Sequence, residues 1–87
     1  MIEDHPVDAK ERRPQRTLDM IGFFCPEPVF RARQTMDEMN QGEILEVQAD
    51  DPAAEEDMIS WTRRSGQELI LVKKHENTFK FLIRKVK

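Results

Sequence analysis

From Thr17 onward the sequence alternates between strand patterns and helix patterns, and their order leaves few ways to build a domain. Alternating apolar and polar residues predict strands at 17–20, 44–49, 68–73 and 78–85. Helical spacing predicts two helices, one from about 26 to 40 and one between residues 50 and 66. We therefore expect an α/β (α+β) two-layer sandwich of order βαβαββ. Its four-stranded mixed sheet would carry both helices on one face, because strand–helix–strand crossovers are nearly always right-handed and so place their helices on the same side.

The first 16 residues differ from the rest of the chain. They hold Pro6 and Pro14, nearly equal numbers of acidic and basic residues, and few apolar side chains that could anchor them. We expect residues 1–16 to form a flexible N-terminal tail. Residues 17–87 are long enough for one independent domain.

Apolar spacing also predicts which faces are buried. The expected core positions are Val29, Ala32, Met36 and Met39 in the first helix, Leu45, Val47 and Ala49 in the second strand, and Ala54, Met58 and Trp61 in the second helix. One face of the sheet stays uncovered in this fold, and Ile44, Ile70, Val72 and Leu82 are candidates for it. They form either a docking surface or a set of scattered surface aliphatics.

Charge and hydropathy exclude several classes of protein. The net charge is −3 and the isoelectric point is about 5.4, so no overall positive field attracts nucleic acid. No apolar run approaches the roughly 20 residues that span a bilayer. The charged N-terminus lacks the apolar stretch of a secretory signal. One cysteine cannot form an internal disulfide, so we expect a free thiol in a reducing compartment, the cytoplasm.

That cysteine, Cys25, lies in the segment Gly22–Pro28, between the first strand and the first helix. A residue that precedes proline is disfavoured in the helical region. Proline itself suits the first helical position. We therefore place Pro26 at the first position of the helix and Cys25 at its N-cap. Negative charge is stabilised there, and the thiolate is the nucleophilic form of cysteine.

Neighbouring residues limit this activation. Pro26 and Pro28 lack N–H groups, so the first turn offers fewer donors to a thiolate. Glu27 adds a negative charge nearby, which Arg31 offsets one turn later. We expect only a modest lowering of the thiol pKa. The two prolines would mainly fix the loop and direct the sulfur outward.

Other cysteine chemistries need groups that this chain lacks. A protease-like nucleophile needs a general base, but the only histidines, His5 and His75, are far from Cys25 in the sequence. A dithiol mechanism needs a second cysteine. One cysteine and two dispersed histidines do not make a metal site, and no cofactor is expected. A persulfide relay, in which Cys25 takes the outer sulfur of a donor persulfide and then yields it to an acceptor, needs none of these groups.

One set of residues extends along the whole folded part: Leu18-Asp19, Gly22, the Cys-Pro-x-Pro motif Cys25-Pro26-Glu27-Pro28, Gly42, Asp50-Asp51-Pro52, Asp57, Trp61, Gly66 and Ile83-Arg84-Lys85. In these residues the chain resembles the TusA-like (SirA-like) sulfurtransferases. The resemblance covers residues 17 to 87. It implies the same βαβαββ sandwich and a sulfurtransferase that acts stoichiometrically as a sulfur carrier.

The resemblance also implies roles and partners. Cys25 would carry the persulfide, Pro26 and Pro28 would shape the loop, and Asp50-Asp51 would cap the second helix. Sulfur would come from a cysteine desulfurase or another sulfurtransferase. It would go to tRNA 2-thiouridine synthesis, molybdenum-cofactor metabolism or sulfur oxidation, often through DsrE-like proteins. Many relatives have a histidine near Gly66, where this chain has Gln67.

Two other functions stay open. A non-catalytic regulatory or protein-interaction domain would use the uncovered sheet face or a helix surface. An RNA-binding module would use Lys80, Arg84, Lys85 and Lys87. The acidic remainder of the chain opposes RNA binding, and the chain has no basic–aromatic alternation suited to base stacking. We therefore expect no direct nucleic-acid binding, no membrane association and a monomer that docks with its partners in turn.

Overall fold

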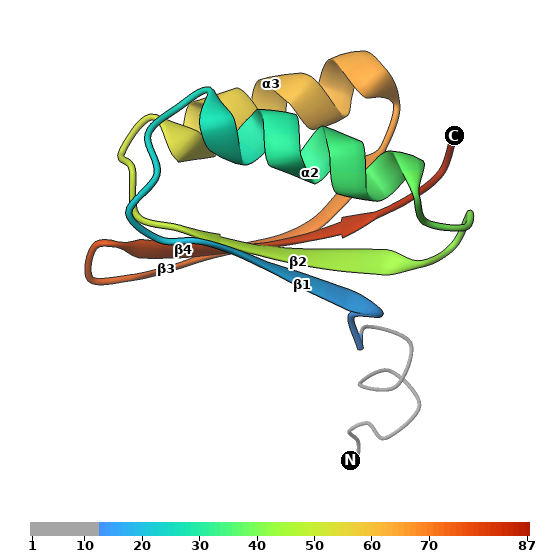
Figure 1. The fold of residues 1–87 in the computed structure, drawn as a ribbon, viewed down its shortest axis with the longest axis horizontal. Helices are drawn as coiled ribbons and strands as arrows, with labels where there is room; N and C mark the ends of the chain where they lie inside the picture. Colours follow the sequence, from blue (N-terminus) through green and yellow to red (C-terminus); the bar gives the residue numbers. More distant parts are fainter. Residues whose placement is uncertain (1–12) are drawn as a thin grey trace.

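The computed structural model describes residues 13–87 and has the expected order of elements, βαβαββ (Figure 1). The elements are β1 Arg16–Met20, α2 Glu27–Asp37, β2 Ile44–Ala49, α3 Ala54–Ser65, β3 Glu68–His75 and β4 Thr78–Arg84. Both helices lie on one face of the sheet, as expected. Most of the tail expected over residues 1–16 lies outside the described residues. Arg16 already belongs to β1.

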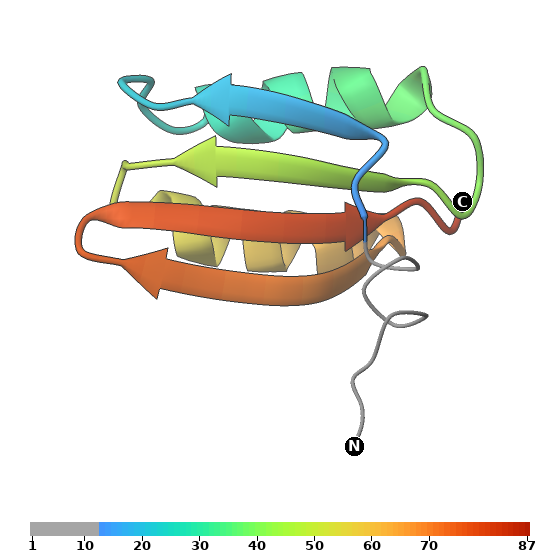
Figure 2. The same cartoon turned by 90° about the horizontal axis from the view of Figure 1, so that it is seen from below.

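The sheet is mixed, with the strand order β1-β2-β4-β3 (Figure 2). β1 pairs with β2 in parallel, and β4 pairs antiparallel with β2 on one side and β3 on the other. β4 is therefore inserted between β2 and β3, which run in the same direction. This arrangement confirms the four-stranded two-layer sandwich.

The core lies between the helices and the covered face of the sheet. Nearly all of the expected positions are buried there, joined by aromatic and aliphatic residues of β4: Ala32, Met36, Met39, Leu45, Val47, Ala49, Ala54, Met58, Trp61, Phe79, Phe81 and Ile83. Val29 is half-buried against this cluster. The rings of Phe79 and Phe81 stack with their centroids 6.0 Å apart.

Val72 does not face the uncovered side of the sheet. It packs against the core, as Leu69 does three positions earlier. Strict alternation would place these two residues on opposite faces. A register shift between Leu69 and Leu71 inserts one extra residue into β3, so the alternation changes phase there. Leu82 lies outside the core cluster, and its cross-strand partner is Leu71.

The first helix is shorter than expected. α2 begins at Glu27 and ends at Asp37, and the N–H of Met39 then donates to the carbonyl of Met36 in a tight turn. Met39 is buried although it lies beyond the helix.

The second helix begins later than expected. Asp50 and Asp51 were expected to cap it directly, but α3 begins at Ala54 with Ala53 at its N-cap. Asp51 instead closes a turn before the helix, since its backbone carbonyl accepts the N–H of Ala54 at 2.9 Å.

Parallel pairing brings two loops together at one end of the sheet. Met20 and Ala49, the last residues of β1 and β2, are register partners. The loops that follow them leave the sheet side by side, at the end that also carries the β3–β4 hairpin (Figures 1 and 2). Cys25 lies in the first of these loops.

No helix among residues 13–87 has the length and apolar character needed to cross a membrane.

Candidate functional site

The loop that carries Cys25 is closed by its own backbone at both ends. At its start the N–H of Phe23 donates to the carbonyl of Met20 at 3.2 Å, and Gly22 has a φ of 90°, which favours glycine. At its end the N–H of Glu27 donates to the carbonyl of Phe24 at 2.9 Å. Cys25 therefore lies in a tight turn that leads directly into α2.

The neighbouring loop holds this turn through two carboxylates. Asp50 accepts the N–H of Gly22 at 2.9 Å, and Asp51 accepts the N–H of Cys25 at 2.5 Å. The second oxygen of Asp51 accepts the N–H of Ala53 at 3.2 Å, just before α3. Capping was the expected role of this acidic pair, but its contacts also connect α3 to the Cys25 loop.

Cys25 lies one position earlier relative to the helix than expected. Pro26 occupies the N-cap of α2, and helical geometry begins at Glu27. The peptide bond between Cys25 and Pro26 is cis. Pro28 is buried and Pro26 is exposed, so one proline anchors the start of the helix and the other stays at the surface. The Cys25 side chain is half-buried beside the core.

The thiol pKa is shifted in the direction opposite to our expectation. Burial, a hydrogen bond to Asp57 and the negative charges of Asp57 and Asp51 raise the pKa of Cys25 from 9.0 to about 12. A thiolate beside two carboxylates is unfavourable because like charges repel, and burial removes water that would solvate it. Conversely, hydrogen bonds from the N–H groups of Cys25 and Ala53 hold the pKa of Asp51 below 3.8. The free protein therefore carries Cys25 as a protonated thiol at neutral pH.

The other expected site residues have more distant roles. Glu27 is half-buried in the first turn of α2, and Arg31 is exposed one turn later. Within residues 13–87, Arg31 makes no hydrogen bond or ion pair with the Cys25 loop. His75 is exposed at the end of β3, and His5 lies outside the described residues.

Gln67 lies at the other end of the sheet from Cys25. It precedes β3, and its side-chain oxygen accepts the N–H groups of Val86 at 2.7 Å and of Lys87 at 3.2 Å. Its side-chain amide donates to the carbonyl of Lys87 at 3.3 Å. Gln67 therefore holds the C-terminal segment and makes no hydrogen bond to the Cys25 loop among the described residues.

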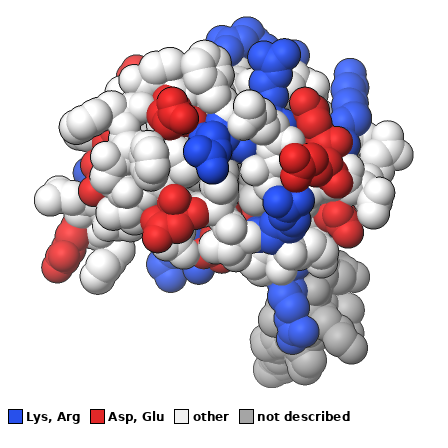
Figure 3. All heavy atoms as spheres, in the orientation of Figure 1, with Lys and Arg blue, Asp and Glu red and all other residues white. Residues whose placement is uncertain are grey.

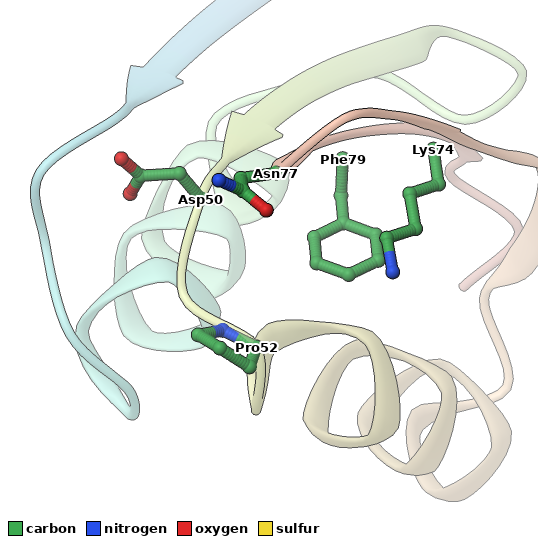
Figure 4. A pocket seen from close by; sticks show the side chains of 5 residues that line it. All are labelled: Asp50, Pro52, Lys74, Asn77 and Phe79. Carbon is green, nitrogen blue, oxygen red and sulfur yellow. The ribbon is translucent and has the colours of Figure 1, made fainter.

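An open recess adjoins the second loop. It has a volume of about 410 Å³ and is lined by Asp50, Pro52, Lys74, Asn77 and Phe79 (Figure 4). The ammonium of Lys74 lies 5.6 Å from the centre of the Phe79 ring, a cation–π contact. Among residues 13–87, no group of three or more His, Cys, Asp and Glu side chains could hold a metal ion.

Sequence reasoning missed two features of the site. Asp57 was quoted for the family resemblance without a role at the thiol, yet it acts directly on the thiol. The second feature is a group of large apolar side chains around Cys25 that stay exposed: Ile21, Phe23, Phe24 and Phe30. Two consecutive aromatic residues before Cys25, in a segment without strand or helix pattern, were a signal for this second feature.

Comparisons with known proteins agree on one family. The family model described as "Sulfurtransferase TusA" matches residues 16–85. The chain is 48% identical over 73 residues to a putative sulfur carrier protein of Archaeoglobus fulgidus, which covers 83% of this chain and 95% of the relative. It is 38% identical over 68 residues to the sulfur carrier protein TusA of Allochromatium vinosum, covering 78% of this chain and 90% of that protein.

A solved structure shares the fold. The crystal structure of a SirA-like protein from Desulfitobacterium hafniense superposes with a TM-score of 0.73. The match covers 84% of this chain and all of the other, at 20% sequence identity.

Proposed function

Because this chain belongs to the TusA family of sulfurtransferases, we propose that it accepts a sulfane sulfur as a persulfide on Cys25 and passes it to a partner protein. The observation that supports this site most strongly is the position of the only cysteine. It is half-buried in a loop that two carboxylates hold at the end of the sheet. Cys25 is therefore held in place without being sealed inside the core.

The transfer consists of two thiol exchanges that balance without an added oxidant or reductant. In loading, the sulfur of Cys25 bonds to the outer sulfur of a donor cysteine persulfide, and the donor S–S bond breaks. The donor sulfur leaves as a thiolate and receives the proton that Cys25 releases. In unloading, an acceptor thiol bonds to the outer sulfur of the Cys25 persulfide, and Cys25 leaves in the same way.

A protonated resting thiol fits a carrier that reacts slowly until it docks with a partner. Nucleophilic attack needs the thiolate, so a pKa of about 12 keeps the free protein slow toward small oxidants and electrophiles. In the proposed exchange the proton moves from Cys25 to the departing donor sulfur. Docking must therefore bring the two sulfur atoms together before the reaction becomes fast.

The partners and the compartment are also part of this proposal. A cysteine desulfurase or another persulfide-bearing protein is the donor, and a protein such as a DsrE-like sulfurtransferase is the acceptor. The sulfur would serve tRNA 2-thiolation, molybdenum-cofactor metabolism or a related route. A free thiol suits the reducing cytoplasm.

The basic residues of the last strand do not favour an RNA-binding function. Arg84 pairs with Glu68 at 3.1 Å, and the ammonium of Lys85 donates to the carbonyl of Met39 at 2.8 Å. These contacts support the end of the sheet that lies away from Cys25. We therefore propose a protein-to-protein relay without direct contact to nucleic acid.

Loading is tested by the intact mass of the protein after incubation with a purified cysteine desulfurase and L-cysteine. The expected result is a gain of about 32 Da that a reductant removes, because the product is one persulfide. Cys25→Ala should gain nothing. A wild-type mass that stays unchanged with both this donor and glutathione persulfide would refute the proposal.

A further inference from the structure

Large apolar side chains are exposed around Cys25 in a way that the fold does not explain. Five large hydrophobic residues are exposed within residues 13–87, and four of them lie between positions 21 and 30. Their exposed fractions are 41% for Ile21, 45% for Phe23, 79% for Phe24 and 54% for Phe30. The fifth, Val86, lies near the C-terminus. We call these four residues, three of which are phenylalanines, the aromatic collar.

None of the four collar residues belongs to the core cluster, and exposing their apolar side chains to water costs free energy. Full burial of a phenylalanine side chain is worth about 1.5–3 kcal/mol relative to exposure. Phe24 immediately precedes Cys25 and is the most exposed of the four. A protein that brings its own cysteine to the half-buried Cys25 therefore has to cover Phe24 as well. Clustered exposure of this kind marks interaction surfaces.

A groove extends the collar between the two helices. It has a volume of about 250 Å³ and is lined by Pro26, Val29, Phe30, Asp57, Ser60 and Arg64. Its lining is therefore partly apolar, and it includes Asp57, the carboxylate that interacts with the Cys25 thiol. Arg64 is engaged within the groove, since it donates to the hydroxyl of Ser60 at 2.7 Å.

The charges around the collar are mostly negative. The carboxylates that touch or adjoin the loop are those of Asp19, Glu27, Asp50, Asp51 and Asp57. The nearby cations are Arg31, one turn into α2, Arg64 in the groove, and Lys74, which lines the recess that also contains Asp50. Figure 3 shows mainly uncharged and acidic side chains at the end of the molecule that carries this loop, with a few basic ones beside them.

From these observations we infer that the aromatic collar is a docking surface for a persulfide-bearing protein whose reactive cysteine lies in an apolar recess edged by lysine or arginine side chains. The inference rests on the proposed function. Apolar contact with Phe24 supplies affinity, and the basic edge meets the carboxylates around Cys25. A basic side chain beside Asp51 and Asp57 also offsets the charges that oppose thiolate formation, so docking and activation occur together.

A second copy of this chain fits the surface less well. Two collars in contact would bury the same apolar side chains, but the two sets of carboxylates would face each other. Like charges brought together in an interface cost free energy. The charge pattern therefore favours a different, basic partner.

The test compares two sulfur donors across two matched variants. The donors are a purified cysteine desulfurase with L-cysteine, which must dock, and glutathione persulfide, which is too small to cover the collar. Phe24→Ser removes the most exposed collar residue, and Val86→Ser removes the exposed large apolar residue that lies outside the collar, as a control. The rate of mass gain is measured for each pair, and thermal unfolding confirms that each variant folds.

The ratio of the uptake rate from the desulfurase to the uptake rate from glutathione persulfide tests whether the collar is a docking surface. For Phe24→Ser, uptake from the desulfurase should fall at least about tenfold more than uptake from glutathione persulfide, as for a hot-spot residue. Val86→Ser should keep the wild-type ratio, and added salt should slow uptake from the desulfurase. If the ratio is unchanged in Phe24→Ser while the wild type still loads, the docking surface is refuted and the proposed function is not. A dimer in sedimentation that Phe24→Ser abolishes would overturn it in favour of self-association.

Discussion

The carboxylate of Asp51 accepts a hydrogen bond of 2.5 Å from the backbone N–H of Cys25, although 26 positions separate the two residues in the sequence. The same carboxylate accepts the N–H of Ala53, at the turn that leads into α3. Asp51 therefore orients the reactive loop and, through its charge, opposes ionisation of the thiol. These two effects can be separated by experiment.

The first prediction concerns the pH dependence of Cys25 alkylation. Only the thiolate reacts, so the rate should rise about tenfold per pH unit until pH reaches the pKa. With a pKa of about 12, the rate of reaction with iodoacetamide should still be rising at about pH 10. An ordinary cysteine approaches its plateau above pH 9.0. A plateau at or below that value would contradict the raised pKa.

The second prediction ranks the two carboxylates. Asp57 raises the thiol pKa more than Asp51 does, through both its hydrogen bond and its charge. At pH 8, Asp57→Asn should therefore alkylate faster than Asp51→Asn, and both should alkylate faster than the wild type. An increase of about tenfold would correspond to one pKa unit. Glu56→Gln, which removes an exposed charge from the same first turn of α3, is the control and should resemble the wild type.

The third prediction concerns stability in acid. The folded-state pKa of Asp51 lies below its ordinary 3.8, so the unfolded chain binds the proton more readily. The stability that Asp51 contributes is therefore present above pH 3.8 and is lost as the pH falls through the lowered pKa. The wild type should lose thermal stability below about pH 4, and Asp51→Asn should lose less over the same range. Parallel curves for the two proteins would contradict this assignment.

The fourth prediction separates the core from the collar. Phe81 is fully buried at the centre of the sheet, so Phe81→Ala should lower the free energy of unfolding by about 3–5 kcal/mol. Phe24→Ala, in a side chain that is 79% exposed, should change it by no more than about 0.5 kcal/mol. Urea unfolding of both variants measures the difference. A large loss for Phe24→Ala would show that the collar supports the fold.

Local patterns were sufficient to predict the architecture but not the register of every strand. Alternation in β2 correctly placed Leu45, Val47 and Ala49 in the core. In a regular strand successive side chains point to opposite faces of the sheet, so the face of one residue determines the face of the next. The same reasoning was wrong for Val72. A one-residue bulge beyond Leu69 reverses the alternation, and no glycine or proline marks it in the sequence.

The local geometry around Cys25 was predicted where it depends on adjacent residues and was missed where it depends on tertiary contact. Pro26 explains why Cys25 lies outside the helix, as expected, although the N-cap is Pro26 and not Cys25. The direction of the thiol pKa was wrong because its causes are burial and the carboxylates of Asp57 and Asp51, which come from the first turn of α3 and from the loop before it. The parallel pairing of β1 and β2 places that loop beside Cys25. Once the strands are expected to be parallel, Asp51 becomes predictable as a neighbour.

The most direct test of the sulfur carrier is cyanolysis of the loaded protein. Cyanide takes the outer sulfur of a persulfide as thiocyanate and leaves the cysteine thiol, so it counts sulfur that is ready for transfer. After loading and removal of small molecules, the wild type should release one equivalent of thiocyanate, since Cys25 is its only cysteine. Cys25→Ser should release none. Equal thiocyanate from both proteins, or none from a wild type that has gained mass, would contradict a persulfide on Cys25.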